Sequence, residues 1–344
     1  MHEPIIFTTA VEETLQSILN DNHYSKVGVL VDENTETHCL PMIDKALSHY
    51  TLIKIKSGEI EKNLSTCAHI WQAMTDDNFD RKSLLINLGG GVIGDMGGFC
   101  AGTFKRGIDF INIPTTLLSQ VDASVGGKLG IDFQGFKNHI GLFQDPRHVV
   151  IDFNFLNTLP LSELRSGFAE VIKHNLIADI HGWSGLVKTD YKSANWNKVI
   201  PHSVKIKSDI VKKDPKEGGL RKALNFGHTI GHAVESYRLN SSDPILHGEA
   251  VALGMICEAY ISQQRGLITS RELEQINTYV LSIFDKIQLS DRDREDACAL
   301  LTHDKKNEGN AILCVLLNSI GNVIWDQPID IKTARESLDY YHQL

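Results

Sequence analysis

Short apolar runs alternate with amphipathic stretches over the first 155 residues, and this alternation most restricts how the chain can fold. The strand candidates are residues 27–31, 52–55, 83–88, 110–113 and 148–151. Helical spacing is found between them, notably in residues 41–50 and 63–74. Buried strands separated by helices form βαβ units and a mostly parallel, Rossmann-like sheet. Ligands of such sheets bind at the carboxyl ends of the strands, where Asp32, Glu59 and the glycines at 89–91 lie.

Beyond residue 155 the sequence changes to long helical patterns. They extend over residues 162–178, 196–213, 222–238, 247–266, 270–285 and 290–302. Two strand-like segments, 312–317 and 322–325, are joined by a turn that contains Gly321. We therefore expect an α/β domain over residues 1–155 and a mainly α-helical domain over residues 156–344.

The charge and the cysteines exclude several classes of protein. With 34 Lys and Arg against 43 Asp and Glu, the net charge is −9. Such a chain is poorly suited to nucleic acid or an acidic membrane surface, so any anionic ligand needs basic residues gathered locally. The six cysteines form no C-x-x-C pair and are expected to be reduced, buried thiols. No apolar run reaches membrane-spanning length and no signal-like start is present, so we expect a cytoplasmic protein.

The segment Gly89-Gly-Gly-Val-Ile-Gly94-Asp95 matches G-x-G-x-x-G, follows a strand candidate and precedes a helical pattern. Glycines at this position let backbone amides approach a pyrophosphate, whose charge the helix N-terminus favours. A tight turn without a ligand is the alternative. The acidic residue usually found about 20 positions later to bind ribose has no good counterpart, because Asp109 precedes a strand. Glu59 is the better ribose carboxylate, so the site departs from a standard dinucleotide fold.

Histidines and one carboxylate suggest a metal site in the second half. His228 and His232 are four residues apart and share a helix face, while His247 begins the next helical pattern. Glu170 lies in a third helical segment. A carboxylate and histidines from three helices can hold a divalent ion with an open position. Structural histidines remain the alternative, since no H-E-x-x-H signature is present.

Basic and amide side chains recur beside these motifs. They are Arg106, Lys128, Lys137, Asn138, Lys173, Lys207, Arg221, Asn225, Lys305 and Lys306. Solvated surface is the simple interpretation of each one, although Lys128 follows two glycines and Lys173 lies in an apolar run. If these side chains converge, the ligand that fits them carries a phosphate and a carboxylate.

Taken together, these segments resemble the 3-dehydroquinate synthase family of the sugar phosphate cyclase superfamily. The similar segments are residues 89–99, 106–108, 114–128, 137–138, 167–173, 217–221, 224–232, 246–249 and 304–306, in order along nearly the whole chain. The resemblance implies a dehydroquinate synthase-like fold, NAD+ and a divalent metal (zinc or cobalt) as cofactors, and a homodimer.

The resemblance also implies a role for particular residues. The metal ligands are Glu170, His228 and His247, with His232 beside them in a proton network. The NAD contacts are Asp32, Asn34, Glu59, Lys62, Gly90, Gly91, Val92, Asp95, Thr115, Thr116, Lys137 and Thr158. The substrate contacts are Arg106, Asp122, Lys128, Asn138, Lys173, Lys207, Glu217, Arg221 and Asn225, with one of Lys305 and Lys306.

The implied reaction converts 3-deoxy-D-arabino-heptulosonate 7-phosphate to 3-dehydroquinate and phosphate, within the shikimate pathway of aromatic amino acid biosynthesis. It proceeds by transient NAD-dependent oxidation, phosphate elimination, reduction and intramolecular aldol closure, and is a lyase reaction. Three alternatives remain open at this stage. They are another sugar phosphate cyclase, a metal- and NAD-dependent polyol dehydrogenase, and a non-catalytic homologue. Lys207, Arg221 and Asn225 favour the dehydroquinate pattern over other cyclases, whose substrates lack the carboxylate.

Overall fold

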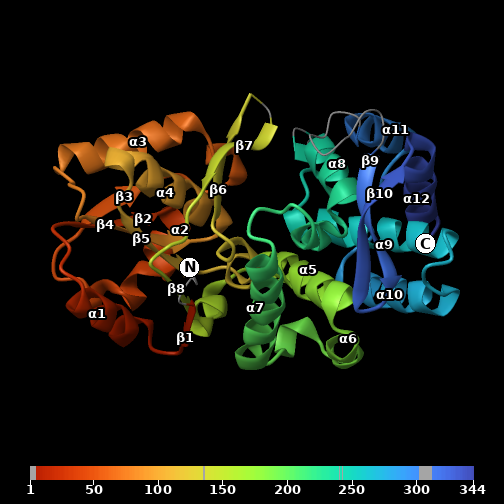
Figure 1. The fold of residues 1–344 in the computed structure, drawn as a ribbon, viewed down its shortest axis with the longest axis horizontal. Helices are drawn as coiled ribbons and strands as arrows, with labels where there is room; N and C mark the ends of the chain where they lie inside the picture. The colour runs from red at the N-terminus through yellow and green to blue at the C-terminus, as the bar shows by residue number, and fades with distance from the viewer. Residues whose placement is uncertain (1–4, 135, 240, 242, 302–311) are drawn as a thin grey trace. The chain divides into compact units, whose positions relative to one another are not determined.

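In the computed structural model the chain folds into two units, Met1–Pro160 (unit 1) and Leu161–Leu344 (unit 2). The structure describes residues 5–134, 136–239, 241, 243–301 and 312–344. Unit 1 contains a parallel α/β sheet, and unit 2 is mainly helical (Figure 1). The predicted fold class is confirmed.

The sheet of unit 1 contains six strands in the order β1-β8-β5-β4-β2-β3, and every neighbouring pair is parallel. The strands are β1 (Ile5–Thr8), β2 (Val27–Val31), β3 (Thr51–Lys54), β4 (Leu84–Gly89), β5 (Asp109–Pro114) and β8 (His148–Asp152). All six residues of β4 are buried. A central parallel strand covered on both faces needs a continuous apolar run, which is the pattern the sequence shows there.

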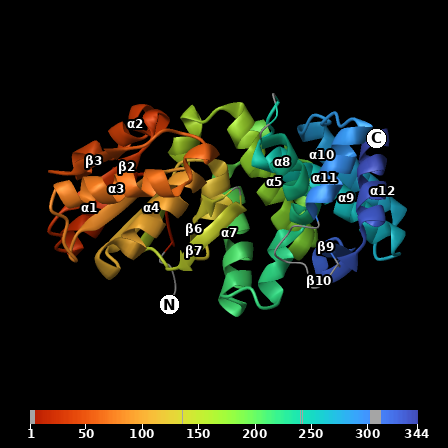
Figure 2. The same cartoon turned by 90° about the horizontal axis from the view of Figure 1, so that it is seen from above.

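Helices cover both faces of this sheet. The helices of unit 1 are α1 (Val11–Asp21), α2 (Glu33–His38), α3 (Leu64–Asp76) and α4 (Gly91–Thr103). Leu30 and Leu85 pack with α3 and α4, whereas their strand neighbours Val29 and Leu84 pack with α1, because successive side chains point to opposite faces. Figure 2 shows α3 and α4 running along the sheet. The unit therefore has two apolar cores, one on each face.

Several parts of unit 1 differ from the sequence-based expectation, and β1, α1 and α2 were not predicted. The predicted helix over residues 41–50 is wrong: the structure has 3₁₀ turns at Leu40–Met42 and Asp44–Ala46. The buried residues of this segment are spaced by three and four, which successive 3₁₀ turns accommodate as well as an α-helix. The antiparallel hairpin of β6 (Lys128–Phe133) and β7 (Phe136–Phe143) was not predicted. A π-helical turn, Ser119–Ala123, precedes it and contains Asp122.

Unit 2 is built around α9. Its described helices are α5 (Leu161–Ala178), α6 (Ile180–Leu186), α7 (Trp196–Lys213), α8 (His228–Leu239), α9 (His247–Gln264), α10 (Ser270–Ile283), α11 (Asp291–Leu300) and α12 (Ile331–Gln343). An antiparallel hairpin joins β9 (Ile312–Ser319) to β10 (Asn322–Ile329). Helix α9 is buried on nearly every side and packs against α5, α8, α10, α12 and β9. A helix that is apolar all round is expected to be central.

The helix predicted over residues 222–238 begins later than expected. The structure has a 3₁₀ turn at Leu220–Asn225, and α8 starts at His228. Gly227 between them has φ +79°, which interrupts a regular helix. Helices α6 and α12 were not predicted.

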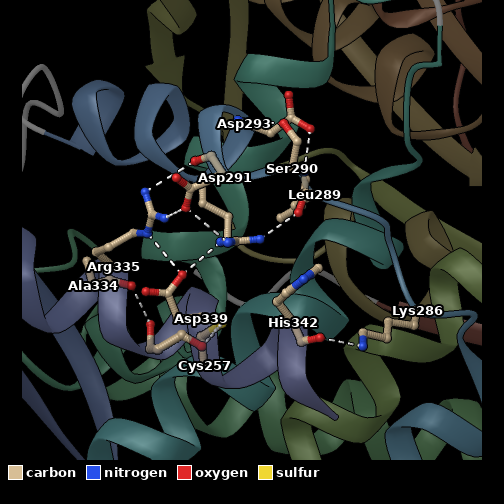
Figure 3. Close-up of polar contacts among 12 residues, drawn as sticks. Cys257, Lys286, Leu289, Ser290, Asp291, Asp293, Ala334, Arg335, Asp339 and His342 are labelled. Atoms are coloured by element: carbon tan, nitrogen blue, oxygen red, sulfur yellow. Dashed lines mark hydrogen bonds and ion pairs between the residues drawn. The ribbon is translucent and has the colours of Figure 1, made fainter.

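Ion pairs tie α11 to α12, as Figure 3 shows. Arg294 bonds Asp339 at 2.8 Å, and Arg335 bonds the same carboxylate at 3.0 Å and pairs with Asp291. Cys257 of α9 donates its thiol to the Ser337 carbonyl of α12 at 3.4 Å. The ion pairs thus join α11 to α12, and the thiol contact joins α12 to α9.

All six cysteines are buried and free, so the expectation of reduced thiols packed as small apolar groups is confirmed. Within the described residues, no helix has the length and apolar character needed to cross a membrane.

Candidate active site

The glycine segment forms the loop between β4 and α4, at the topological switch point of the sheet. Strands β2 and β4 are neighbours in the sheet, and the connection after β2 runs to β3 on one side whereas the connection after β4 runs to β5 on the other. Open α/β sheets bind ligands outside the carboxyl ends of the strands at this point. Asp32 follows β2 there, and Gly90 follows β4.

The N-terminus of α4 fits a pyrophosphate group. Its N-cap residue, Gly90, makes no side-chain capping bond, so the amides of the first turn can meet an anion. The Thr115 amide donates to the Gly89 carbonyl at 3.0 Å, and a Cβ on Gly90 would lie 3.2 Å from Thr116 Cγ2. A Cβ on Gly97 would collide with Asn87, so α4 lies directly on β4. The structure thus brings together the predicted Gly90, Gly91, Val92, Thr115 and Thr116.

Lys62 links two other predicted cofactor or substrate residues. Its ammonium donates to Asp95 Oδ2 at 2.6 Å and to Asn138 Oδ1 at 2.7 Å. Burial would lower the pKa of Lys62, but the carboxylates of Asp95 and Glu59 raise it. Lys137 Nζ lies 3.8 Å from Glu59 Oε1. One buried cation therefore connects the segment after β3 with the start of α4 and with the β6–β7 hairpin.

Five other residues predicted in unit 1 cap a helix, are exposed, or follow the far end of α4. Asp32 Oδ1 accepts the amides of Asn34 (3.0 Å) and Thr35 (2.8 Å) and so caps α2. The side chains of Asn34, Lys128 and Thr158 are exposed. Arg106 follows the far end of α4, about 20 Å along the helix from the glycine loop at 1.5 Å per residue. Their proposed contacts stay predictions.

The predicted metal ligands converge within unit 2. Oε1 of Glu170 on α5 lies 3.4 Å from His228 Nε2 and 3.7 Å from His247 Nε2. Ligand atoms of a tetrahedral site with bonds of about 2.0–2.1 Å are separated by about 3.3 Å. His232, one turn along α8, has its ring centroid 4.9 Å from that of His228 and 5.7 Å from that of His247. The three histidines form a group that could hold a metal ion.

The hydrogen bonds of these side chains also fit a metal. Nδ1 of His228 bonds the Phe226 carbonyl oxygen at 3.1 Å, and Nδ1 of His247 bonds Glu235 Oε2 at 3.4 Å. Metal-bound histidines usually donate their second N–H in this way, which leaves Nε2 as the ligand atom. Oε1 of Glu170 is buried and makes no hydrogen bond with the described residues. A buried carboxylate oxygen facing two imidazole nitrogens is suited to a divalent cation.

Charge is balanced locally around Glu170. Burial would raise its pKa, but the Lys173 ammonium, paired with Oε2, and the two imidazoles hold that pKa well below its usual value. Burial and Lys173 lower the pKa of His228. Burial would also lower the pKa of His247, but the carboxylates of Glu170 and Glu235 raise it to about 9.

The three helices that carry these side chains meet with their backbones in close approach. A Cβ on Gly248 of α9 would collide with the Ser166 carbonyl of α5, and one on Gly254 would collide with the Gly227 carbonyl before α8. A Cβ on Gly231 would lie 2.7 Å from the Ala250 carbonyl oxygen. Glycine is therefore required for α5, α8 and α9 to lie at this spacing.

A buried carboxylate that the sequence analysis missed holds the start of α8. Glu258 of α9 is fully buried and accepts the amides of Gly227 (2.6 Å), Thr229 (3.1 Å) and Ile230 (3.3 Å). These amides have no partner within the helix, so a carboxylate from a neighbouring helix caps them. Because His228 is the first residue of α8, Glu258 fixes the backbone of a proposed metal ligand.

The predicted anion-binding residues of unit 2 lie on packed elements. Lys207 of α7 and Arg221 of the 220–225 turn are buried, and both elements pack against α5. Arg221 donates to the Pro215 carbonyl at 2.6 Å, and Asn225 donates to Glu217 Oε1 at 2.8 Å. Asp214, which was not predicted, accepts the amides of Gly218, Gly219 and Arg221 at 2.9, 2.7 and 3.0 Å. Lys305 and Lys306 lie outside the described residues.

The missed carboxylates left different signals in the sequence. Glu235 is seven residues after His228 and three after His232, so all three share a helix face. Glu258 is a lone charge within the apolar segment 250–261, where a buried carboxylate needs a partner. Asp214 follows a helix and precedes Gly218 and Gly219, a common pattern of loops.

Solved structures similar to this chain define its fold class. A 2-epi-5-epi-valiolone synthase from Streptomyces hygroscopicus subsp. jinggangensis 5008, with NAD+ and Zn2+ bound, has a TM-score of 0.87 and 23% identity, covering 100% of this chain and 97% of that one. A 2-deoxy-scyllo-inosose synthase complexed with carbaglucose-6-phosphate, NAD+ and Co2+ has a TM-score of 0.86 and 23% identity, covering 96% and 95%. The fold is that of the sugar phosphate cyclases.

Sequence comparison narrows this class to one family. The models for the N-terminal and C-terminal parts of 3-dehydroquinate synthase match residues 52–166 and 167–307. A 3-dehydroquinate synthase from Parabacteroides distasonis is 41% identical over 99% of this chain and 98% of its own length. One from Alkaliphilus metalliredigens is 40% identical over 87% of this chain and 85% of its own length. The chain belongs to the 3-dehydroquinate synthase family, which is a family of enzymes.

Proposed function

We propose that this chain converts 3-deoxy-D-arabino-heptulosonate 7-phosphate to 3-dehydroquinate and inorganic phosphate. The family implies a sugar-phosphate substrate. The structural observation that supports the proposal most directly is the convergence of Glu170 Oε1 on Nε2 of His228 and His247. That donor set, on three closely packed helices, suits a metal that binds substrate oxygens at its open position.

Each unit would hold one cofactor. The amides and glycines at the start of α4 would hold the pyrophosphate of NAD+, with Glu59 on a ribose, and Glu170, His228 and His247 would hold zinc or cobalt. When bound, NAD+ supplies reversible acceptance of a hydride from C5, and the metal supplies polarisation of the C5 oxygen. Because the hydride would return to the substrate, the reaction would have no net redox change.

The chain's own residues in unit 2 would bind the substrate's anionic groups and move its protons. Lys207 and Arg221 are buried cations in an acidic protein, and Arg221 can pair two oxygens of one carboxylate or phosphate. His232 lies beside the proposed ligands and can exchange a proton with a substrate hydroxyl. Asn225, held by Glu217, adds a neutral donor and acceptor.

One assay separates this function from its alternatives. Purified protein with NAD+ and the heptulosonate phosphate should release phosphate and form dehydroquinate in equal amounts, without accumulating NADH. Steady accumulation of NADH from a polyol would instead identify a dehydrogenase. Phosphate release only from a substrate without the carboxylate would identify another cyclase. A mass in solution about twice the chain's 38.3 kDa would support the expected homodimer.

A further inference from the structure

Glu235 is a buried carboxylate that directly contacts a proposed metal ligand without facing the metal position. It lies on α8, its side chain is 8% exposed, and its Oε2 is 3.4 Å from His247 Nδ1 on α9. The opposite ring nitrogen of His247 faces Glu170. Glu235 therefore bonds the side of the imidazole that points away from the metal.

We propose that Glu235 is a positioning residue, which accepts the Nδ1–H of His247 and so presents Nε2 to the metal. The inference rests on the proposed function only in assuming the metal. A carboxylate in this position fixes the tautomer, orients the ring and makes the ligand nitrogen a better electron donor. Loss of such a partner typically costs 10- to 100-fold in metal affinity.

The two histidine ligands differ in how their rings are held. The Nδ1 partner of His228 is the carbonyl oxygen of Phe226, two residues away, so the local backbone orients that ring. The Nδ1 partner of His247 is a side chain twelve residues away on another helix. Substitution can therefore remove the partner of His247 while both ligands stay in place. This makes the contribution of Glu235 measurable.

The test compares Glu235→Ala and the isosteric Glu235→Gln with the wild-type chain. Zn2+ affinity is measured by competition with a chelator, the ligand field by the visible absorption of the Co2+-loaded protein, and stability by the melting temperature of metal-free protein. Glu272→Gln is a matched control, because Glu272 is a helix-capping carboxylate of the same unit, on α10.

We expect Glu235→Ala to weaken Zn2+ binding 10- to 100-fold. Glu235→Gln should weaken it less, because its amide oxygen still accepts, and should shift the Co2+ bands. Glu272→Gln should change neither the Zn2+ affinity nor the Co2+ absorption bands.

The result is decided by metal binding and not by activity. Wild-type Zn2+ affinity and an unchanged Co2+ spectrum in both variants would overturn the proposal. A lower melting temperature with normal metal binding would overturn it as well, because Glu235 would then serve packing alone. If Glu235→Ala does not fold, the Co2+ spectrum of Glu235→Gln decides. If the wild-type chain releases no phosphate, and the Glu235 variants bind Zn2+ more weakly than the wild type, the proposed function is refuted and this inference is supported.

Discussion

Replacing Glu258 by glutamine should destabilise unit 2 by far more than a surface substitution does. The carboxylate is fully buried and accepts three amides at the start of α8, one on Oε2 and two on Oε1. Glutamine has the same shape but only one acceptor oxygen. Its amide nitrogen must face at least one backbone N–H, which is then left without an acceptor.

The expected loss follows from the number of amides affected. A buried donor without a partner costs about 1–3 kcal/mol, and loss of a negative charge at a helix N-terminus adds about 0.3–2 kcal/mol. We therefore expect a loss of about 2–4 kcal/mol in the free energy of unfolding. For a unit of this size, each kcal/mol lowers the melting temperature by about 2–4 °C, so Glu258→Gln should melt about 5–15 °C lower.

Thermal unfolding of the metal-free protein, followed by circular dichroism, measures this effect. The control is again Glu272→Gln, whose carboxylate accepts the amide and hydroxyl of Thr269 at the solvent-accessible start of α10. Caps of that kind are worth about 1 kcal/mol. If Glu258→Gln melts within 2 °C of the wild type or no lower than the control, the capping argument is refuted. Reduced Zn2+ affinity is also expected, because His228 begins the capped helix.

Three further predictions concern the candidate site. Chelation should abolish activity, and Zn2+ or Co2+ should restore it. The His247→Ala variant should lose the metal, whereas His232→Ala should keep the metal but lose rate. The reverse result would exchange the roles of the two histidines. Glu59→Ala should weaken NAD+ binding about 10- to 100-fold, since charge-assisted hydrogen bonds contribute about 1.5–3 kcal/mol; an unchanged Kd in a calorimetric titration would place the ribose contact elsewhere. Arg221→Lys should lower kcat/KM at least about tenfold while metal content is unchanged. If Arg221→Lys instead melts at a lower temperature but binds a phosphonate substrate analogue normally, the main role of Arg221 is its hydrogen bond to the Pro215 carbonyl.

The sequence predicted those elements whose burial produces a regular pattern. Strand β4 and helix α7 were predicted almost to the residue, because one is covered on both faces and the other has a clear apolar stripe. Strand β1 has only four residues and lies at the sheet edge, so it gives little periodic signal. The β6–β7 hairpin was hidden by glycines, which carry no pattern. Helix α12 does carry a signal in the sequence, since Asp330 caps it and Ala334, Leu338 and Tyr341 form its buried stripe.

The candidate site divides in the same way. Side chains proposed to contact a ligand directly, such as Glu170 and His228, have residue types that suggest their chemistry from the sequence. Glu235, Glu258 and Asp214 act through a ring nitrogen or through backbone amides of other segments. Their partners are 4 to 31 residues away along the chain, and contacts of this kind become visible only when the helices and loops are placed in space.

The glycines between α5, α8 and α9 also restrict how this enzyme can be altered. Ordinary helix pairs are separated by side chains, so their spacing can shift when a core residue changes size. Here backbone meets backbone at Gly231, Gly248 and Gly254, which leaves no side chain to exchange for a larger or smaller one. The distance between the proposed metal-ligand positions is therefore closed to gradual adjustment. New substrate preferences in this scaffold, natural or engineered, should arise from the loops and from α7, while the three-helix centre stays as it is.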